Sequence, residues 1–217
     1  MAKLGNVVII AEKPSVARDI ARVVGAFHQG EGYLQGGGYT VTWAIGHLVT
    51  LPEPHQINPA WKAWSFPQLP MLPEKWPLIA VEKTRNQFEI VRNLLSQCDE
   101  VICATDAGRE GELIFRYIYE LSKCKKPVKR LWISSLTKDS IENGLRHLKP
   151  LSFYDSLSDA ARARSRADWL FGMNLSRAYA LTTNDQLFVG RVQTPTLAMV
   201  VDRDLKIQNF KSEDYVV

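Results

Sequence analysis

Two short acidic sequences each follow an apolar run, and their side chains are the best suited to chemistry. Glu12 follows the run at 7–10, and Asp106 and Glu110 follow the run at 101–103. If the two runs are neighbouring parallel strands, their carboxyl ends meet at one edge of a sheet, where ligands of open α/β folds bind. Three carboxylates at that edge make an oxygen-lined site that suits Mg²⁺. The sequence therefore predicts a divalent-metal site assembled from distant positions.

Basic side chains next to these acids indicate what the second ligand is. Lys13 and Arg109 adjoin the acidic positions, which favours a phosphate-bearing partner. The formal net charge is only +4, but basic residues gather at 122–150 and again among the arginines of 162–203. Such stretches are either solvated faces or an electrostatic footprint for nucleic acid, and charge alone leaves both interpretations open.

Alternating strands and helices must position these residues in the first two thirds of the chain. The stretch 30–38 is rich in glycine and is expected to form turns, whereas 52–77 is rich in proline and tryptophan and is expected to be irregular. Apolar periodicity gives the remaining elements. Strands are expected at 7–11, 39–45, 101–104 and 128–133, and helices from Ser15, as the amino-terminal cap, to Gly25, at 85–97, at 110–122 and from Thr137 to about 148.

The pattern changes near Pro150, which divides the chain into two expected domains. Before it, the alternation predicts an α/β fold with a mainly parallel sheet flanked by helices, over 1–150. After it, strand alternation is absent, and 151–217 is expected to be mostly helical. Helices are expected at 158–182 and 196–205, with a loop at 184–188 between them.

Composition is typical of an ordinary globular protein and narrows the possible locations. The 217 residues are 46% hydrophobic and 23% charged. No apolar stretch approaches the roughly 18 residues of a membrane span, and the start at 1–6 lacks the apolar core of a secretion signal. Three cysteines without a Cys-x-x-Cys pair argue against disulfides and zinc. We therefore expect a cytoplasmic protein with no membrane partner.

Five motifs occur together and in order along the chain. They are Glu-Lys-Pro-Ser at 12–15, Gly-His-Leu at 46–48, Asp-Ala-Gly-Arg-Glu-Gly-Glu at 106–112, Ala-Asp-Trp-Leu at 167–170 and Gly-Arg-Val-Gln-Thr-Pro at 190–195. Together they closely resemble the amino-terminal third of bacterial type IA DNA topoisomerases of the topoisomerase III kind. The resemblance implies a Toprim domain that binds Mg²⁺, followed by the opening part of a helical domain that holds single-stranded DNA.

The resemblance also implies a reaction and a role for each acidic and basic residue. A tyrosine attacks a DNA phosphodiester, a 5′-phosphotyrosine link forms, another strand passes, and the break is resealed. Glu12 would transfer a proton to or from the departing 3′-oxygen, and Lys13 would stabilise charge on the phosphoryl oxygens. Asp106 and Glu110, with Glu12, would hold Mg²⁺. Arg191 would fix a phosphate near the nucleophile.

The same resemblance implies a set of DNA contacts, several of which have a structural alternative. His47 could instead be a buried histidine, Asp168 could pair with an arginine such as Arg164, and Arg191 could be a solvated loop residue. Glu12 and Asp106 could likewise do no more than cap the helices that follow them. The implied contacts are His47, Asp168, Ser176, Arg177, Phe188, Val189, Gly190, Arg191, Val192 and Gln193; of these, Asp168 and Ser176 share one helix face with Gly172.

Two departures from the family pattern limit what the chain is expected to do alone. Gly108 stands where the common acidic motif, Asp-x-Asp-x-Glu, has its middle aspartate, so one ligand is lost. Glu112, beyond Glu110 on the incipient helix, is expected to point elsewhere. None of the tyrosines, which include Tyr215, lies in a motif that matches the nucleophile. We therefore expect the remaining domains of the enzyme as partners, with no DNA cleavage by this chain alone.

Three interpretations follow, and they belong to different classes of protein. The first is part of a type IA topoisomerase, which relaxes or decatenates DNA. The second is a free-standing Toprim nuclease or primase-like enzyme that uses metal alone. The third is a non-catalytic module that binds single-stranded DNA. We favour the first, because a minimal Toprim nuclease has no use for the motif at 190–195.

Overall fold

The computed structural model describes residues 7–212 and 214, which form two compact units. The first unit comprises the described residues up to Pro52 together with Trp76–Arg164. The second comprises Glu53–Lys75 together with the described residues from Ser165 onward. Residues 1–6, which bear on the secretion signal, and Tyr215 lie outside the described residues.

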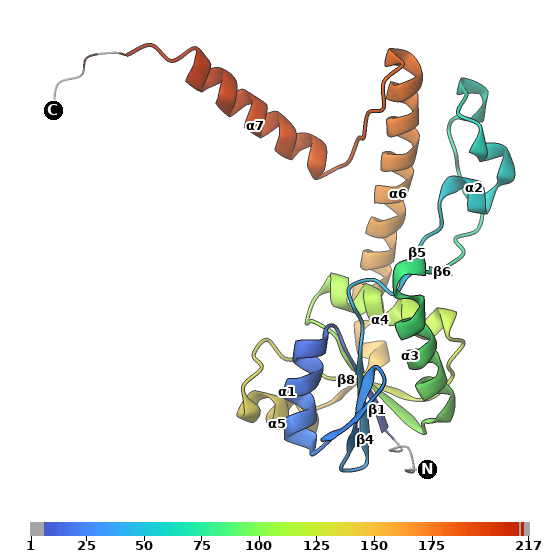
Figure 1. Cartoon of the computed structure of the whole chain (residues 1–217), viewed down its shortest axis with the longest axis vertical. Coiled ribbons are helices and arrows are strands. Elements are labelled where there is room, and N and C mark those ends of the chain that lie inside the picture. The colour runs from blue at the N-terminus through green and yellow to red at the C-terminus, as the bar shows by residue number, and fades with distance from the viewer. Residues whose placement is uncertain (1–6, 213, 215–217) are drawn as a thin grey trace. The chain divides into compact units, whose positions relative to one another are not determined.

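A seven-stranded mixed sheet forms the centre of the first unit (Figure 1). Its middle strands run parallel, β4 and β7 each pairing with β1 and β8 pairing with β7. The outer strands are antiparallel to their neighbours. The predicted α/β fold with a mainly parallel sheet is confirmed. Across the sheet the order is β2 (His28–Gly30), β3 (Tyr33–Gly36), β4 (Tyr39–Trp43), β1 (Val7–Ala11), β7 (Glu100–Ala104), β8 (Val128–Arg130) and β9 (Lys149–Pro150).

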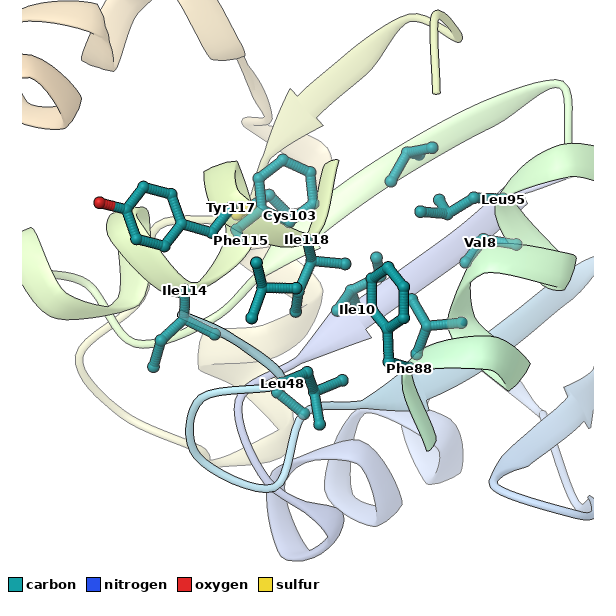
Figure 2. Packing of buried hydrophobic residues seen from close by; sticks show 14 of the residues in the cluster. Val8, Ile10, Leu48, Phe88, Leu95, Cys103, Ile114, Phe115, Tyr117 and Ile118 are labelled. Atoms are coloured by element: carbon teal, nitrogen blue, oxygen red, sulfur yellow. The ribbon is translucent and has the colours of Figure 1, made fainter. Parts of the chain in front are cut away.

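Helices cover both faces of this sheet, because the central strands are apolar on both sides. In β1, Ile9 packs with one buried cluster and Ile10 with the other, as the alternation of side chains along a strand requires. The first cluster lies under α1 (Pro14–Val24) and α5 (Lys138–Arg146). The second lies under α3 (Arg85–Gln97) and α4 (Arg109–Leu121), and Figure 2 shows its packing.

Several local predictions in the first unit are wrong. The strands expected at 39–45 and 128–133 end earlier, at Trp43 and Arg130. The stretch 30–38 is not only turn: β2 and β3 pair as antiparallel strands, in which Gly30 pairs with Tyr33, and Gly36 pairs with Tyr39 of β4. The cap of α1 is Lys13 and not Ser15. Pro14 explains the shift, because proline fits the first helical position, where its missing N–H costs nothing. The predicted end at Gly25 is confirmed by its left-handed φ of 75°.

The second unit consists of two long helices and of residues Glu53–Lys75, called the excursion below. The excursion leaves and re-enters the first unit next to the short antiparallel strands β5 (Val49–Thr50) and β6 (Ile79–Ala80). It contains α2 (Pro54–Ile57) and two 3₁₀ turns. The helices are α6 (Asp155–Thr183), which begins in the first unit, and α7 (Gln193–Gln208). Among residues 7–212 and 214, no helix combines the length and apolarity needed to cross a membrane.

The excursion is held to α6 by hydrogen bonds inside the second unit. The side chain of Asn174 both accepts from the N–H of Met71, at 2.6 Å, and donates to its carbonyl, at 3.1 Å. Met71 is fully buried. The predicted irregular character of 52–77 is therefore broadly right, but its backbone is fixed by specific contacts with a helix about a hundred residues later.

Candidate metal and nucleic-acid site

The carboxyl ends of three parallel strands bring the predicted acidic motifs to one edge of the sheet. Ala11 at the end of β1 pairs with Ala104 at the end of β7 and with Trp43 at the end of β4. Glu12 follows the first of these strands, and Asp106 lies just beyond the second. The convergence expected from the sequence is therefore present in the first unit.

Two short contacts connect the side chains at this edge. The backbone N–H of Asp106 donates to Oε2 of Glu12 at 2.7 Å. Nε2 of His47, in the loop after β4, lies 2.6 Å from Oε1 of Glu110 on α4. Four of the predicted site residues are thus brought together. His47 is exposed, so the alternative that it is a buried core histidine is wrong.

The charges at this edge act on Glu12. Burial raises the pKa of the Glu12 carboxyl, and the negative charges of Asp106 and Glu110 raise it further. The hydrogen bond from Asp106 and the positive charge of Lys13 oppose that rise. Lys13 and Arg109 are both exposed. The arrangement concentrates negative charge, with cations at its border, and so favours binding of a cation together with an anion.

The start of α4 explains why the acidic motif contains glycine. A Cβ on Gly111 would lie 2.2 Å from the carbonyl oxygen of Asp106, so only glycine allows this close approach. Thr105 holds the same turn, donating from Oγ1 to the carbonyl of Gly111 at 2.7 Å. Gly108 is the cap residue of α4, in extended backbone, with nothing within 4 Å of a Cβ added there.

The acidic residues do not cap the two helices. The cap positions of α1 and α4 are Lys13 and Gly108, and neither helix has a side-chain cap hydrogen bond. Glu12 accepts instead from the N–H of Asp106, across the sheet edge. The alternative that Glu12 and Asp106 serve only as helix caps is therefore wrong.

The donor chemistry suits Mg²⁺, although the side chains are not arranged as a closed cage. No group of three or more His, Cys, Asp or Glu residues with metal-site geometry is present in the part of the chain that the structure describes. Carboxylate oxygens are nonetheless the ligands Mg²⁺ takes, and it usually binds through one or two of them together with waters and substrate phosphates. An open edge with Asp106 and Glu110 exposed fits that mode of binding.

Glu112 points away from this edge, as the sequence predicted. It is fully buried and pairs with Arg130 at 3.1 Å and with Arg116 at 2.8 Å. Arg130 lies beside this edge, but the sequence indicates it only as one of many basic residues at 122–150. Lys129 and Arg130 stand side by side in the expected strand at 128–133, and the sequence does not show which of the two is buried.

In the second unit, one face of α6 carries the motif at 190–195. Asp168 pairs with Nε of Arg191 at 2.7 Å, and Ser176 accepts from the N–H of Val189 at 2.9 Å. A Cβ on Gly172, between them on the helix, would come within 3.5 Å of the carbonyl of Val189. The shared face predicted from four-residue spacing thus holds a loop of the same chain.

The loop presents several of the predicted DNA contacts to the surface. Phe188 and Val192 are 71% and 66% exposed, and Arg191 is also exposed. The N–H of Gly190 donates to Oγ1 of Thr194, and Nε2 of Gln193 donates to the carbonyl of Phe188. These bonds fix the loop while leaving its side chains open to a ligand.

Arg177 occupies a different environment from the other predicted contacts. Its side chain is buried, and it donates to the carbonyl of Trp61 at 2.6 Å and lies over the ring of Trp64. Burial lowers the pKa of its guanidinium, and the charge of Glu53 opposes that shift. This arginine anchors the excursion to α6, and its predicted DNA contact stays a prediction.

This combination of a mainly parallel sheet with carboxylates at the carboxyl ends of its strands defines a class of domain. Residues 7–136 match the family model of the Toprim domain, and residues 152–217 match that of DNA topoisomerase. The chain belongs to the Toprim domain family.

Particular relatives agree with the predicted resemblance to topoisomerase III. The chain is 52% identical over 210 residues to DNA topoisomerase 3 of Bacillus cereus, and 50% identical over 209 residues to that of Shouchella clausii. These alignments cover 96% and 95% of this chain but only 29% of each relative. The chain therefore spans less than a third of the length of these relatives.

A solved structure has the same fold. The structure of full-length topoisomerase I from Thermotoga maritima matches with a TM-score of 0.62 at 22% identity. That match covers 94% of this chain and 31% of the other. At this level of identity, the likeness bears on the fold alone.

Proposed function

We propose that this chain supplies the Toprim part of the DNA cleavage site of a type IA topoisomerase. The observation that carries the proposal is the 2.7 Å contact between Glu12 and the N–H of Asp106, which joins the two acidic motifs at one sheet edge. The pair of Glu110 with His47 extends that edge to a second exposed carboxylate. The similarity to DNA topoisomerase 3 supports DNA as the substrate.

Each residue at the edge receives a chemical task in this proposal. The raised pKa of Glu12 suits it to hold a proton and to pass it to or from the departing 3′-oxygen. Lys13, exposed beside it, faces charge on the phosphoryl oxygens. Asp106 and Glu110, with Glu12, would hold Mg²⁺, which when bound screens phosphate charge and orients the broken ends.

Single-stranded DNA is the proposed ligand of the second unit. The exposed loop at 188–193 offers an arginine, an aromatic ring and an amide, the groups that bind a strand by its backbone and by stacking. Arg191 would exchange its bond with Asp168 for a phosphate, which the planar guanidinium binds through two nitrogens. Such a protein would act with further domains and with DNA, in the bacterial cytosol.

A chimeric enzyme tests this proposal directly. Residues 1–217 would replace the matching part of Bacillus cereus DNA topoisomerase 3, whose remaining segments supply the nucleophilic tyrosine that the resemblance implies. We expect the chimera to relax negatively supercoiled DNA in the presence of Mg²⁺. Glu12→Ala and Asp106→Ala should each lower the relaxation rate by about 100-fold or more, since each removes a group placed at the reacting phosphate.

The matched control is Glu31→Ala, which removes an exposed carboxylate from the turn between β2 and β3. Its rate should equal that of the unsubstituted chimera. An active chimera that tolerates Glu12→Ala and Asp106→Ala would refute the site. Metal-dependent nicking of DNA by the 217-residue chain itself, with no covalent adduct, would favour the free-standing nuclease. DNA binding by the chain without any activity in the chimera would favour the binding module.

A further inference from the structure

Arg130, at the end of β8, is a fully buried cation beside the carboxylate edge, and the proposed function gives it no task. Its exposed fraction is 0%, as is that of Glu112, its partner at 3.1 Å. Burying a charged pair costs desolvation free energy that an apolar pair of similar size avoids. A buried pair in the layer behind the site therefore calls for an explanation beyond stability.

The guanidinium of Arg130 is bonded to the backbone that leads into the site. Nη1 donates to the carbonyl of Thr105 at 2.7 Å and to that of Cys103 at 3.2 Å. Nη2 donates to the carbonyl of Asp106 at 2.7 Å. Three backbone carbonyls, at the end of β7 and in the loop to α4, are thus bonded to one planar group. The planar fork of an arginine spreads its donors over three nitrogens in a fixed arrangement, whereas the three donors of a lysine ammonium share one nitrogen.

These bonds lead from Arg130 to Glu12 through a single peptide group. The carbonyl of Thr105 and the N–H of Asp106 are the two ends of one peptide. Arg130 donates to its carbonyl, and its N–H donates to Glu12, each at 2.7 Å. A cation on the carbonyl polarises the peptide and strengthens its N–H as a donor. The position of Glu12 relative to Asp106 therefore depends on Arg130.

The other side of Arg130 is closed, so its guanidinium has one orientation. Glu112 accepts from Nε, and the ring of Trp132 covers the guanidinium carbon at 4.9 Å from its centroid. Trp132 in turn stacks on Tyr154, with 4.5 Å between ring centroids. Arg116 holds the second oxygen of Glu112 at 2.8 Å but has no bond to the Asp106 loop among the described contacts.

We infer that Arg130 is a positioning residue, which fixes the backbone at Thr105 and Asp106 and so sets the spacing of the Glu12 and Asp106 carboxylates for Mg²⁺. Only the part of the inference that concerns Mg²⁺ rests on the proposed function. The placement of the backbone is a separate claim that needs no metal.

Arg130→Lys and Arg116→Lys in the full 217-residue chain form a matched pair for the test. Both substitutions keep the charge next to Glu112, but only the first removes a fork that touches Asp106. In the metal-free chain, we expect the exchange of the Asp106 amide hydrogen to accelerate about tenfold or more in Arg130→Lys, because its bond to Glu12 weakens. In Arg116→Lys it should stay within twofold of the unsubstituted chain.

Mg²⁺ affinity, measured by calorimetry on the same three proteins, provides the second readout. Residues behind a metal ligand typically change affinity by about 10–100-fold when substituted, and we expect a loss in that range for Arg130→Lys alone. Equal Asp106 exchange in the two variants would overturn the inference. If the unsubstituted chain binds no Mg²⁺, the proposed metal role fails, while the exchange experiment still decides the placement of the backbone.

A measurement on the unsubstituted chain covers the case in which Arg130→Lys does not fold. The guanidinium nitrogens of Arg130 and Arg116 would be followed by nitrogen-15 NMR during titration with Mg²⁺. Because Arg130 contacts the Asp106 loop directly, its Nη signals should move while those of Arg116 stay in place. Binding of Mg²⁺ that leaves the Arg130 signals unchanged would overturn the inference.

Discussion

At the scale of single residues, Glu12 shows how a site can oppose the stability of its own fold. Its carboxylate is partly buried next to two other negative charges, and its pKa is raised as a result. A carboxyl whose pKa is higher in the folded state binds its proton more tightly there. It therefore favours folding at a pH below its unfolded pKa, and that contribution is lost as the pH rises through the folded pKa.

We therefore expect Glu12→Gln to stabilise the chain at neutral pH while removing its chemistry. Glutamine keeps an oxygen that can accept from the N–H of Asp106 but carries no charge. The gain in the free energy of unfolding should be about 0.5 kcal/mol at pH 7, a small value because water screens a half-buried group. It should vanish in acid, where Glu12 is protonated. Urea unfolding of both proteins across this pH range measures it.

The exposed Glu31→Gln serves as the control for the loss of one negative charge. This substitution should leave the unfolding curve unchanged at both ends of the range. A Glu12→Gln chain less stable than the parent at neutral pH would contradict the argument, since it would mean that the ionised carboxylate is net favourable in the fold.

At the scale of elements, the first turn of α4 distinguishes two glycines of one motif. Gly111 must be glycine, because a Cβ there would collide with the backbone of Asp106. Gly108 lies at the cap position with a φ of −179°, which any residue adopts, and has open space around it. Its presence in place of the aspartate of the common motif is thus not imposed by the backbone.

Gly108→Asp should accordingly be accepted by the fold and strengthen Mg²⁺ binding. Aspartate at a helix cap is at least as favourable as glycine, by a few tenths of a kcal/mol. An added carboxylate at the same edge should raise Mg²⁺ affinity by about tenfold, because affinity follows ligand charge and number. Calorimetric titration of the chain measures this. Gly108→Ala tests the same backbone change without a ligand, and equal affinities for the two variants would contradict the prediction.

The elements also show what the sequence could and could not predict. Periodicity predicted α3 at Arg85–Gln97 with the bounds it has, and the cap of α5 at Thr137, which accepts from the N–H of Ser140. The hairpin of β2 and β3 could not be predicted, because a cluster of glycines indicates turns. In the structure, two of these glycines, Gly30 and Gly36, pair with residues of neighbouring strands. The role of Arg130 could not be predicted, because its acceptors are backbone carbonyls at the end of β7 and in the loop that follows, and backbone acceptors leave no trace in the sequence.

The site followed the same division. The meeting of Glu12 with Asp106 could be predicted, since parallel strands place their carboxyl ends at one edge. The bond between His47 and Glu110 could not, because it depends on how the loop after β4 lies against α4. Asp168 and Ser176 were predicted to share one face of a helix, and both contact the loop at 189–191. The sequence did not indicate that this face binds a loop of the same chain.

At the scale of the whole molecule, the excursion at 53–75 is a structural part of the second unit. Its backbone forms hydrogen bonds with the side chains of Asn174 and Arg177. It lies in the chain between the paired strands β5 and β6. Replacing 53–75 by a short glycine–serine linker should leave the first unit folded. Residues 165–183 of α6 should lose about 2 kcal/mol of protection against hydrogen exchange, since hydrogen bonds to a buried charge contribute about that much.

Hydrogen exchange followed by mass spectrometry separates the two effects by peptide. Amides of α3 and α4 should exchange as in the parent chain, while those of α6 after Ser165 should exchange faster. Asn174→Ala, which removes only the bonds to Met71, should give a smaller change in the same peptides. Unchanged protection of α6 would contradict the structural role of the excursion, and faster exchange in α3 and α4 would contradict the expectation that the first unit stays folded without it.

The separation in sequence between the excursion and its partners has a consequence for the order of events during synthesis. Met71 precedes Asn174 by 103 residues, and Trp61 precedes Arg177 by 116. The ribosome therefore releases the excursion long before α6 exists to receive it. The sheet of the first unit can form before that point, so the proline- and tryptophan-rich segment remains without its partners, and Met71, which is fully buried in the folded chain, is still exposed. Slow codons or a bound chaperone in that interval would act on this segment before any other part of the second unit.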